Sequence, residues 1–284
     1  MFPAGSLSHS LLAPGRDPDP AGSRVDSPSA SALGRGRVAE ERPFAIGGPG
    51  AVRESEGPGG EKAQLDELKA LAEVRSRTWW LLSRFFLERP EPAFLAELGA
   101  AFGSPPASEV AVNPDVDALV AYLREATPED LGRRLAPEFT RLLRGIQEGS
   151  GPPPPYESLY RGQSVGGDLT LAVLNRYRAA GFGEVEPSVG PQDHLGAELR
   201  FLALLALGEG EAWGSGETEV ALTRIVQQQG FLDAHLLTWL PTYAARLEAE
   251  AREVFYGAAA RLTLAFARET RADLDLIEAD LEAA

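Results

Sequence analysis

Residues whose types could support chemistry gather in the second half of the chain. Asp193 and His194 are adjacent, and Glu198 follows His194 by four residues, so His194 and Glu198 would share one face of a helix. Upstream of them, residues 162–166 read G-Q-S-V-G and match the G-x-S-x-G pattern with Ser164 as the nucleophile. These residue types suggest two candidate chemistries, namely hydrolysis at Ser164 and metal binding around His194.

A serine hydrolase would use Ser164 with Asp193 and His194, and the chain order Ser, Asp, His suits that reading. The surroundings of the serine do not, because a nucleophile elbow needs a buried strand before it and a helix directly after it. Here four prolines at 152–155 and a tyrosine-rich turn precede it. Asp193 also has little freedom to orient an imidazole that is its direct neighbour in the chain. The hydrolase is therefore the alternative, and we expect a plain loop around Ser164.

Metal and nucleotide sites find less support in the sequence. Asp233 and His235 could approach His194 and Glu198, but a helical di-iron centre needs two Glu-x-x-His pairs and the sequence contains none. His235 is better explained as a half-buried histidine of the core. The glycine-rich loop before Asp168 has no lysine, and Asp168 would place negative charge where a phosphate should bind. We expect no metal and no cofactor.

Composition divides the chain near residue 60. Residues 1–60 contain 11 Gly, 8 Pro and 8 Ser, too few apolar groups to offset the entropy of ordering, so we expect a disordered extension. Residues 61–284 form the second expected domain and hold 35 acidic against 21 basic side chains. This negative charge makes nucleic acid an unsuitable partner and a basic peptide a better one.

Cysteine is absent from the sequence, which excludes disulfides and thiolate metal sites and fits a reducing compartment. We expect a cytoplasmic protein, because the N-terminus has no basic region followed by an apolar one. The longest purely apolar run, 201–207, is far shorter than the roughly 20 residues that cross a bilayer, so we expect no membrane insertion. The adjacent arginines Arg133 and Arg134 lie mid-chain without an apolar run behind them, so they form no twin-arginine export signal.

Apolar residues recur at spacings of three and four over most of 61–284, which is the period of amphipathic helices. No stretch alternates with period two between hairpin turns, so no sheet is expected. The sequence predicts an all-α fold, a compact single-domain bundle of about eight to ten helices. The expected helices are 61–88, 93–102, 114–126, one from Thr127, 168–180, one from Pro191 with Asp193 and His194 in its first turn, 217–229, 231–240, 241–251, 252–270 and a short acidic C-terminal helix.

Prolines and glycines set most of the expected boundaries. Asn113 and Thr127 each precede a proline and are expected N-caps. Pro137 should kink or restart the helix that begins at Thr127. Gly230 should stop one helix and Pro241 should begin another.

Four motifs follow one another in a recognisable order. They are Glu138-Phe139-Thr140-Arg141-Leu142-Leu143, Tyr156-Glu157-Ser158-Leu159-Tyr160, Pro191-x-Asp193-His194-Leu195-x-x-Glu198-Leu199 and Phe231-x-x-x-His235-Leu236-x-x-Trp239-Leu240-Pro241. In type and order these residues resemble the TorD/DmsD/NarJ family of redox-enzyme maturation chaperones, over roughly residues 70–268. The resemblance implies an all-helical chaperone that is not an enzyme.

The resemblance also implies a partner. Such a chaperone binds the twin-arginine signal peptide and the apo form of a molybdopterin-containing oxidoreductase subunit, assists cofactor insertion and delays export. It implies at most weak binding of a guanine nucleotide. Carried over to this sequence, the positions expected to bind the partner are Tyr156, Glu157, Ser158, Tyr160, Pro191, Asp193, His194 and Glu198.

The chemistry of such a peptide suggests how it is recognised. It offers two arginines and an apolar helix-forming segment, so its receptor needs carboxylates beside an apolar groove. Glu157, Asp193 and Glu198 can provide the carboxylates, and residues 195–207 the apolar surface. We therefore expect these carboxylates and His194 at the mouth of a groove.

Overall fold

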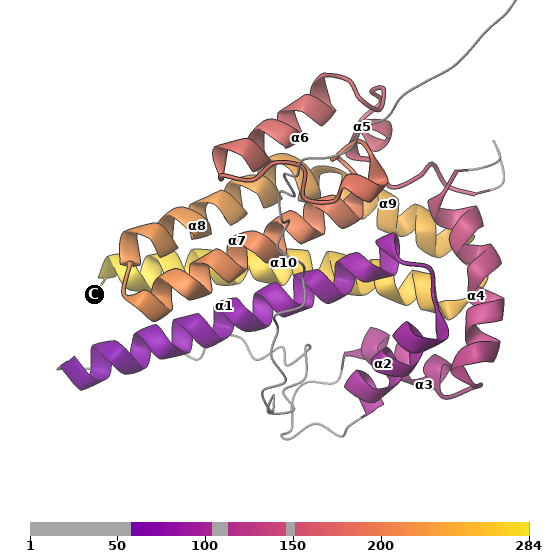
Figure 1. Ribbon diagram of the computed structural model, residues 1–284, viewed down its shortest axis with the longest axis horizontal. Helices are drawn as coiled ribbons and strands as arrows, with labels where there is room; N and C mark the ends of the chain where they lie inside the picture. The colour runs from indigo at the N-terminus through magenta and orange to yellow at the C-terminus, as the bar shows by residue number, and fades with distance from the viewer. Residues whose placement is uncertain (1–57, 104–112, 146–150, 284) are drawn as a thin grey trace, which may run out of the picture. The chain divides into compact units, whose positions relative to one another are not determined.

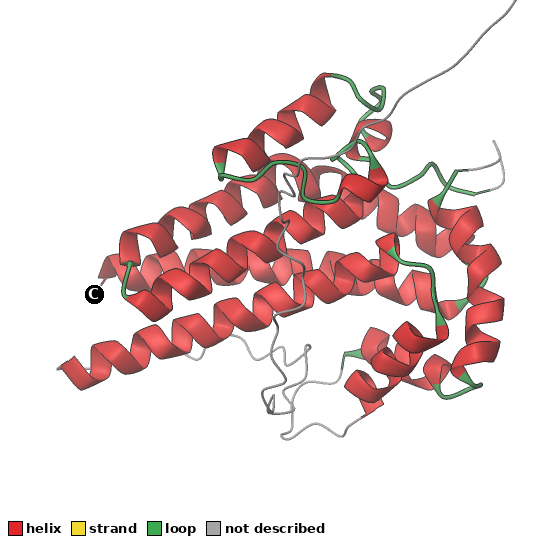
Figure 2. Cartoon of the chain, viewed as in Figure 1, coloured by secondary structure: helices red, strands yellow, loops and turns green. Residues whose placement is uncertain are grey.

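Helices and their connections account for the described part of the chain. The computed structural model describes residues 58–103, 113–145 and 151–283, which all fall in one compact unit spanning 41–284. These residues form ten α-helices, a 3₁₀ turn and a π-helical turn, and Figure 2 draws them only as helix and loop. The predicted all-α class is confirmed. The predicted extension 1–60 lies outside the described residues, apart from 58–60 at the start of the first helix.

Two antiparallel helices, α1 (Pro58–Leu87) and α7 (Leu195–Ser215), pack along each other in this unit (Figure 1). Gly196 at the start of α7 faces the side chain of Leu87 at the end of α1. Because glycine has no Cβ, the two helices approach closely there. The side chains of α7 are buried on nearly every side, as its apolar sequence predicts.

Three helices, α2 (Pro92–Gly103), α3 (Pro114–Leu123) and α4 (Pro128–Leu143), follow α1. Both predicted N-caps are confirmed. The Asn113 side chain accepts the N–H of the second residue of α3, and the Thr127 hydroxyl accepts that of the third residue of α4. Each cap satisfies one backbone donor that the first turn leaves free, which fixes where the helix begins.

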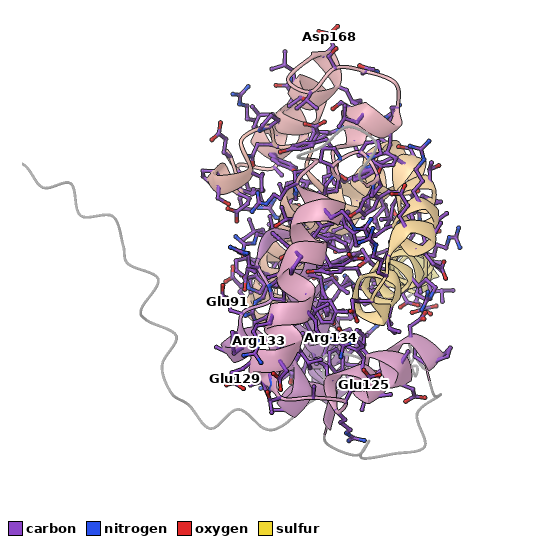
Figure 3. All side chains as sticks on the ribbon, turned by 90° about the vertical axis from the view of Figure 1, so that its right-hand side faces the viewer. Glu91, Glu125, Glu129, Arg133, Arg134 and Asp168 are labelled. Atoms are coloured by element: carbon purple, nitrogen blue, oxygen red, sulfur yellow. The ribbon has the colours of Figure 1, made fainter. Side chains whose placement is uncertain are left out.

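The outer face of α4 carries the adjacent arginines and a proline. Figure 3 shows Arg133 and Arg134 near labelled acidic side chains, and the Arg134 guanidinium donates to Glu253 at 2.7 Å. The sequence predicts a kink or a restart at Pro137; the helix continues through this residue, so it does not restart there. Arg133 and Pro137 are both exposed, so water can solvate the Arg133 carbonyl that the proline leaves without a donor.

The second half of the described chain runs from one short helical turn into longer helices. No helix in the described ranges is long and apolar enough to cross a membrane. The elements are α5 (Glu157–Tyr160), α6 (Asp168–Ala179), the 3₁₀ turn Pro187–Val189, α8 (Thr218–Phe231), the π-helical turn Leu232–Leu236, α9 (Leu237–Glu250) and α10 (Val254–Ala283).

Three predicted boundaries in this half are wrong. Gly230 does not stop α8, because the chain continues helically through the π-helical turn, whose Leu232 and Leu236 are buried in the core. Pro241 lies inside α9 rather than at its start, close behind the π-helical turn, where the usual hydrogen-bond pattern is already interrupted. The two predicted C-terminal helices form a single one, α10, whose last 26 residues contain neither glycine nor proline.

Candidate functional site

The segment around α5, which we define as residues 151–167 and call the α5 segment, lies beside the start of α7. The N–H of Glu157 donates to the carbonyl of Asp193 at 2.8 Å, and the N–H of Leu195 donates to the carbonyl of Pro155 at 2.8 Å. These two bonds run in opposite directions between the same two stretches of chain. The second and third sequence motifs are thereby held side by side.

The start of α7 differs from the prediction. α7 begins at Leu195 with His194 as its N-cap, so the prediction that Pro191 opens the helix is wrong. Nδ1 of His194 accepts the N–H of Gly196 at 3.1 Å. The backbone of His194 is extended because it forms an isolated antiparallel bridge with Tyr156, and that pairing keeps the preceding residues out of the helix.

His194 is enclosed by its neighbours. Its ring contacts the ring of Tyr156 edge to face, with 5.0 Å between the centroids. Burial, followed by the positive charge of Arg144, lowers the pKa of His194 to about 3. The imidazole is therefore neutral at physiological pH and can keep accepting the backbone N–H that starts α7.

Asp193 connects three elements through its side chain. Oδ2 accepts the N–H of Ser158 in α5 at 3.1 Å, and Oδ1 accepts the hydroxyl of Thr170 in α6 at 2.8 Å. All three residues are buried. The Asp193 carboxylate therefore fixes the positions of α5 and α6 relative to the start of α7.

Glu157 is the one acidic residue of the α5 segment, and both of its carboxylate oxygens have a partner. Oε1 accepts Nη1–H of Arg161 at 2.6 Å, and Oε2 lies 3.0 Å from Nδ1 of His235. Glu157 is fully buried, whereas the Arg161 side chain is 36% exposed. Glu157 is thus contacted from the solvent side by Arg161 and from the core side by His235 of the π-helical turn.

Glu198, one turn into α7, forms a pair with Glu157. Its Oε2 accepts Nε1–H of Trp239 at 3.2 Å, while its Oε1 has no hydrogen-bond partner. Burial, followed by the negative charge of Glu157, raises the pKa of Glu198 well above its usual range. Once protonated, Glu198 can donate a hydrogen bond to Glu157.

The two tyrosines of the second sequence motif, Tyr156 and Tyr160, anchor the α5 segment. The Tyr160 hydroxyl donates to the carbonyl of Pro153 at 2.7 Å, and its ring packs against Trp239 and Tyr243 at centroid distances of 5.6 and 5.3 Å. The Tyr156 hydroxyl donates to the Val189 carbonyl at 2.9 Å. Aromatic packing from α9 and hydrogen bonds to neighbouring loops therefore hold both ends of this motif.

The eight predicted binding residues are brought together, but most of them face inward. Glu157, Ser158, Asp193 and Glu198 have no exposed surface, and His194 is 5% exposed. Tyr156, Tyr160 and Pro191 are half-buried. The carboxylates therefore do not lie at the mouth of a groove, and that prediction is wrong. Their role in binding stays a prediction.

The residues of the alternative hydrolase are not arranged as a catalytic relay. Ser164 lies on an exposed turn, and no hydrogen bond in the described part of the chain joins it to His194 or Asp193. Asp193 bonds to α5 and α6 instead, and Nδ1 of His194 is committed to the N-cap. Among the residues that the structure describes, no group of His, Asp and Glu has the arrangement of a metal site.

Sequence reasoning missed three residues that build this site. Thr170 and Arg161 bond to Asp193 and Glu157, and neither belongs to a recognised motif. The buried amide of Gln192 accepts the N–H groups of Val185 and Glu186 and so shapes the loop before α7. The helical start signal at Asp168 could have pointed to Thr170 as a first-turn residue, but no local pattern reveals its partner.

Comparison with known proteins adds independent information. The sequence model of a family described as the nitrate reductase delta subunit matches residues 109–245, which include all eight predicted binding positions. The chain is also similar to the chaperone protein TorD of Vibrio cholerae serotype O1 (strain M66-2), with 34% identity over 217 residues. That alignment covers 74% of this chain and 96% of the relative.

More distant relatives carry the same name. The chaperone protein TorD of Vibrio parahaemolyticus serotype O3:K6 is 29% identical over 220 residues, which cover 72% of this chain and 96% of the relative. The TorD of Shewanella pealeana is 26% identical over 229 residues, which cover 76% of this chain and 95% of the relative. These relatives are named as chaperones, and the alignments cover nearly their whole length.

Proposed function

The chain belongs to the TorD family of chaperones, and from that membership we propose that it is a cytoplasmic chaperone for a molybdopterin-containing oxidoreductase subunit. It binds the twin-arginine signal peptide and the apo form of that subunit, assists cofactor insertion and delays export until the cofactor is in place. The observation that supports the proposal is that Glu157, Asp193, Glu198 and His235, from three separate motifs, meet around one short segment.

The charge of the chain suits this client. The formal net charge is −15, so a peptide with two arginines is attracted before it makes contact. The carboxylates of the site are buried, and the cost of taking an arginine out of water to pair with them offsets much of the attraction. Burial of the apolar part of the signal peptide therefore supplies most of the affinity, while the carboxylates set register and selectivity.

The end of the α5 segment, residues 160–167, is the part of the site that can yield to a peptide. Tyr160 covers the buried rings of Trp239 and Tyr243, so displacement of these residues presents an apolar aromatic surface next to Glu157. Ordering a flexible peptide on such a surface costs roughly 2–5 kcal/mol, so we expect affinity in the micromolar range.

No resident cofactor enters this proposal, because the molybdopterin belongs to the client. Weak guanine-nucleotide binding stays a prediction from family resemblance alone. Equilibrium dialysis of the full chain against a labelled guanine nucleotide measures it directly, and saturation at low micromolar nucleotide would contradict the expected weakness.

Isothermal titration of the full chain with a twin-arginine signal peptide tests the proposed function. We expect a saturable heat with one peptide per chain, and weaker binding of an otherwise identical peptide with two lysines, because the guanidinium pairs with carboxylates in a planar, bidentate geometry. Equal affinity for both peptides contradicts the electrostatic part of the proposal. No binding of either peptide contradicts the proposal as a whole.

A further inference from the structure

Arg161 stands between a buried carboxylate and solvent. Its Nη1 donates to Oε1 of Glu157 at 2.6 Å and to the carbonyl of Ala234 at 3.3 Å. Glu157 has no exposed surface, whereas the Arg161 side chain is 36% exposed. The guanidinium therefore lies on the solvent side of the Glu157 carboxylate. We call the two acceptors, the Glu157 carboxylate and the Ala234 carbonyl, the arginine socket.

Of the two acceptors of the socket, Glu157 is fully buried and Ala234 is half-buried. Ala234 lies in the π-helical turn Leu232–Leu236, a rare geometry that often occurs at functional sites. The next residue, His235, is buried, lies 3.0 Å from the second oxygen of Glu157 and stacks on Phe231 with 5.0 Å between centroids. One carboxylate oxygen is thus held from within the core, and the other is left to a guanidinium that arrives from outside.

Arg161 itself is attached to a part of the chain that is less constrained than the socket. It is the residue directly after α5, and Gly162 and Gly166 adopt positive φ angles of 69° and 80° in the turns that follow. Residues 161–166 are exposed. The socket can therefore stay in place while Arg161 swings into solvent at little cost in packing.

We propose that Arg161 is an intramolecular placeholder, which fills the arginine socket in the free protein and gives way to an arginine of the client peptide. This inference rests on the proposed function. Exchange of one guanidinium for another leaves the buried Glu157 carboxylate paired both before and after the peptide binds, which avoids the large penalty of an unpaired buried charge in the complex. It also favours arginine over lysine, because a guanidinium is less strongly hydrated than an ammonium group and loses less on entering.

The first test compares peptide affinities by calorimetry. If Arg161 occupies the socket for most of the time in wild type, it reduces the apparent affinity for the peptide in proportion to the fraction of molecules whose socket is free. Arg161→Ala removes this competitor, so it should bind the twin-arginine peptide about three- to tenfold more tightly than wild type. Arg84→Ala is the matched control, because Arg84 also pairs with a glutamate four residues away and its loss changes the net charge equally. We expect its affinity to equal that of wild type within twofold or so.

The second test needs no peptide. In Arg161→Ala the socket is vacant, so guanidinium chloride at low millimolar concentration should raise the unfolding temperature relative to sodium chloride at equal ionic strength. Wild type and Arg84→Ala should show no such rise. The double variant Arg161→Ala, Glu157→Gln should lose it, because the carboxylate is gone. The comparison within one variant remains valid even if that variant is less stable than wild type.

The two tests separate this inference from the function on which it rests. If wild type binds the peptide but Arg161→Ala binds it no more tightly, or shows no guanidinium stabilisation, the placeholder role is overturned and the proposed function stands. If neither protein binds the peptide, the proposed function fails and the placeholder role fails with it. Guanidinium stabilisation then shows only that the socket exists.

Discussion

The carboxylate of Asp193 and the hydroxyl of Thr170 form a buried hydrogen bond of 2.8 Å between the loop before α7 and the first turn of α6. The same hydroxyl accepts the N–H of Gly166 at 3.0 Å, at the end of the α5 segment. Thr170 therefore links the glycine-containing turn of the α5 segment to the carboxylate that positions α5. This pair makes the site a single packed structure rather than a set of independent motifs.

Replacement of Thr170 by valine should reduce the free energy of unfolding by about 1–3 kcal/mol, because Asp193 loses a donor in a buried environment. Thr170→Ser keeps the hydroxyl and should stay within about 1 kcal/mol of wild type. Urea denaturation of the two variants measures the difference. Equal midpoints for valine and serine would show that the bond adds nothing to stability.

Replacement of Glu198 by glutamine should increase stability at neutral pH. The raised pKa of Glu198 means that its stabilising contribution is fully present below the unfolded value of 4.5 and is lost as pH rises through the raised folded value. Glutamine mimics the protonated carboxyl at every pH and so avoids this loss.

The measurement is the difference in unfolding free energy between Glu198→Gln and wild type at pH 5 and at pH 8. We expect the difference to grow in favour of the variant as pH rises. The exposed Glu219→Gln is the control, for which the difference should be the same at both pH values. A Glu198→Gln protein that loses stability at pH 8 contradicts the assignment of a protonated Glu198.

The contribution of His194 to the free energy of unfolding should depend on pH in the opposite direction to that of Glu198. Its pKa of about 3 lies below the unfolded value of 6.5, so the contribution is present above pH 6.5 and is lost as pH falls from there toward 3. His194→Asn retains an N-cap acceptor that cannot be protonated and should lose less stability between pH 6.5 and 4. NMR titration of the His194 ring gives a direct reading, and protonation above pH 6 would contradict the account.

The close approach of α1 and α7 should make Gly196 intolerant of a side chain. A Cβ at Gly196 meets Cγ of Leu87 at 2.3 Å, so Gly196→Ala should destabilise the protein by about 1–3 kcal/mol through overpacking. At Gly210, on the same helix, the nearest atoms are 3.5 Å away. Gly210→Ala should therefore be neutral or stabilise by up to about 1 kcal/mol. Thermal unfolding of both variants measures the difference, and an unfolding temperature of Gly196→Ala equal to that of wild type would contradict the close contact between Gly196 and Leu87.

Much of the fold could be predicted because its signals are local. Asn113 and Thr127 cap their helices with side chains only two or three residues from the groups they bond, so the pattern is visible in sequence. The apolar character of α7 likewise reveals its central position. The helix boundaries predicted at Gly230 and Pro241 were wrong because the deciding interactions are not local. Burial of the residues around them keeps the chain helical against the local preference of glycine and proline.

The residues of the candidate site could be named from the sequence, but not their arrangement, and their role in binding stays a prediction. Motif order pointed to Glu157 and Asp193, yet the partner of Glu157 across 78 residues, His235, follows only from the packing of the π-helical turn against α5. Exposure was also beyond the sequence. An acidic residue is usually solvated, and nothing local indicates that Glu198 is fully enclosed beside another carboxylate.

We propose that the α5 segment and the start of α7 receive the client peptide. A twin-arginine peptide that carries a photoreactive benzoylphenylalanine beside its arginines, bound to the full chain and irradiated, reports the contact directly by mass spectrometry. We expect crosslinks within residues 151–167, 191–198 or 231–243, and few with the two-lysine peptide. Specific crosslinks confined to α2, α3 or the C-terminal half of α10 would contradict it.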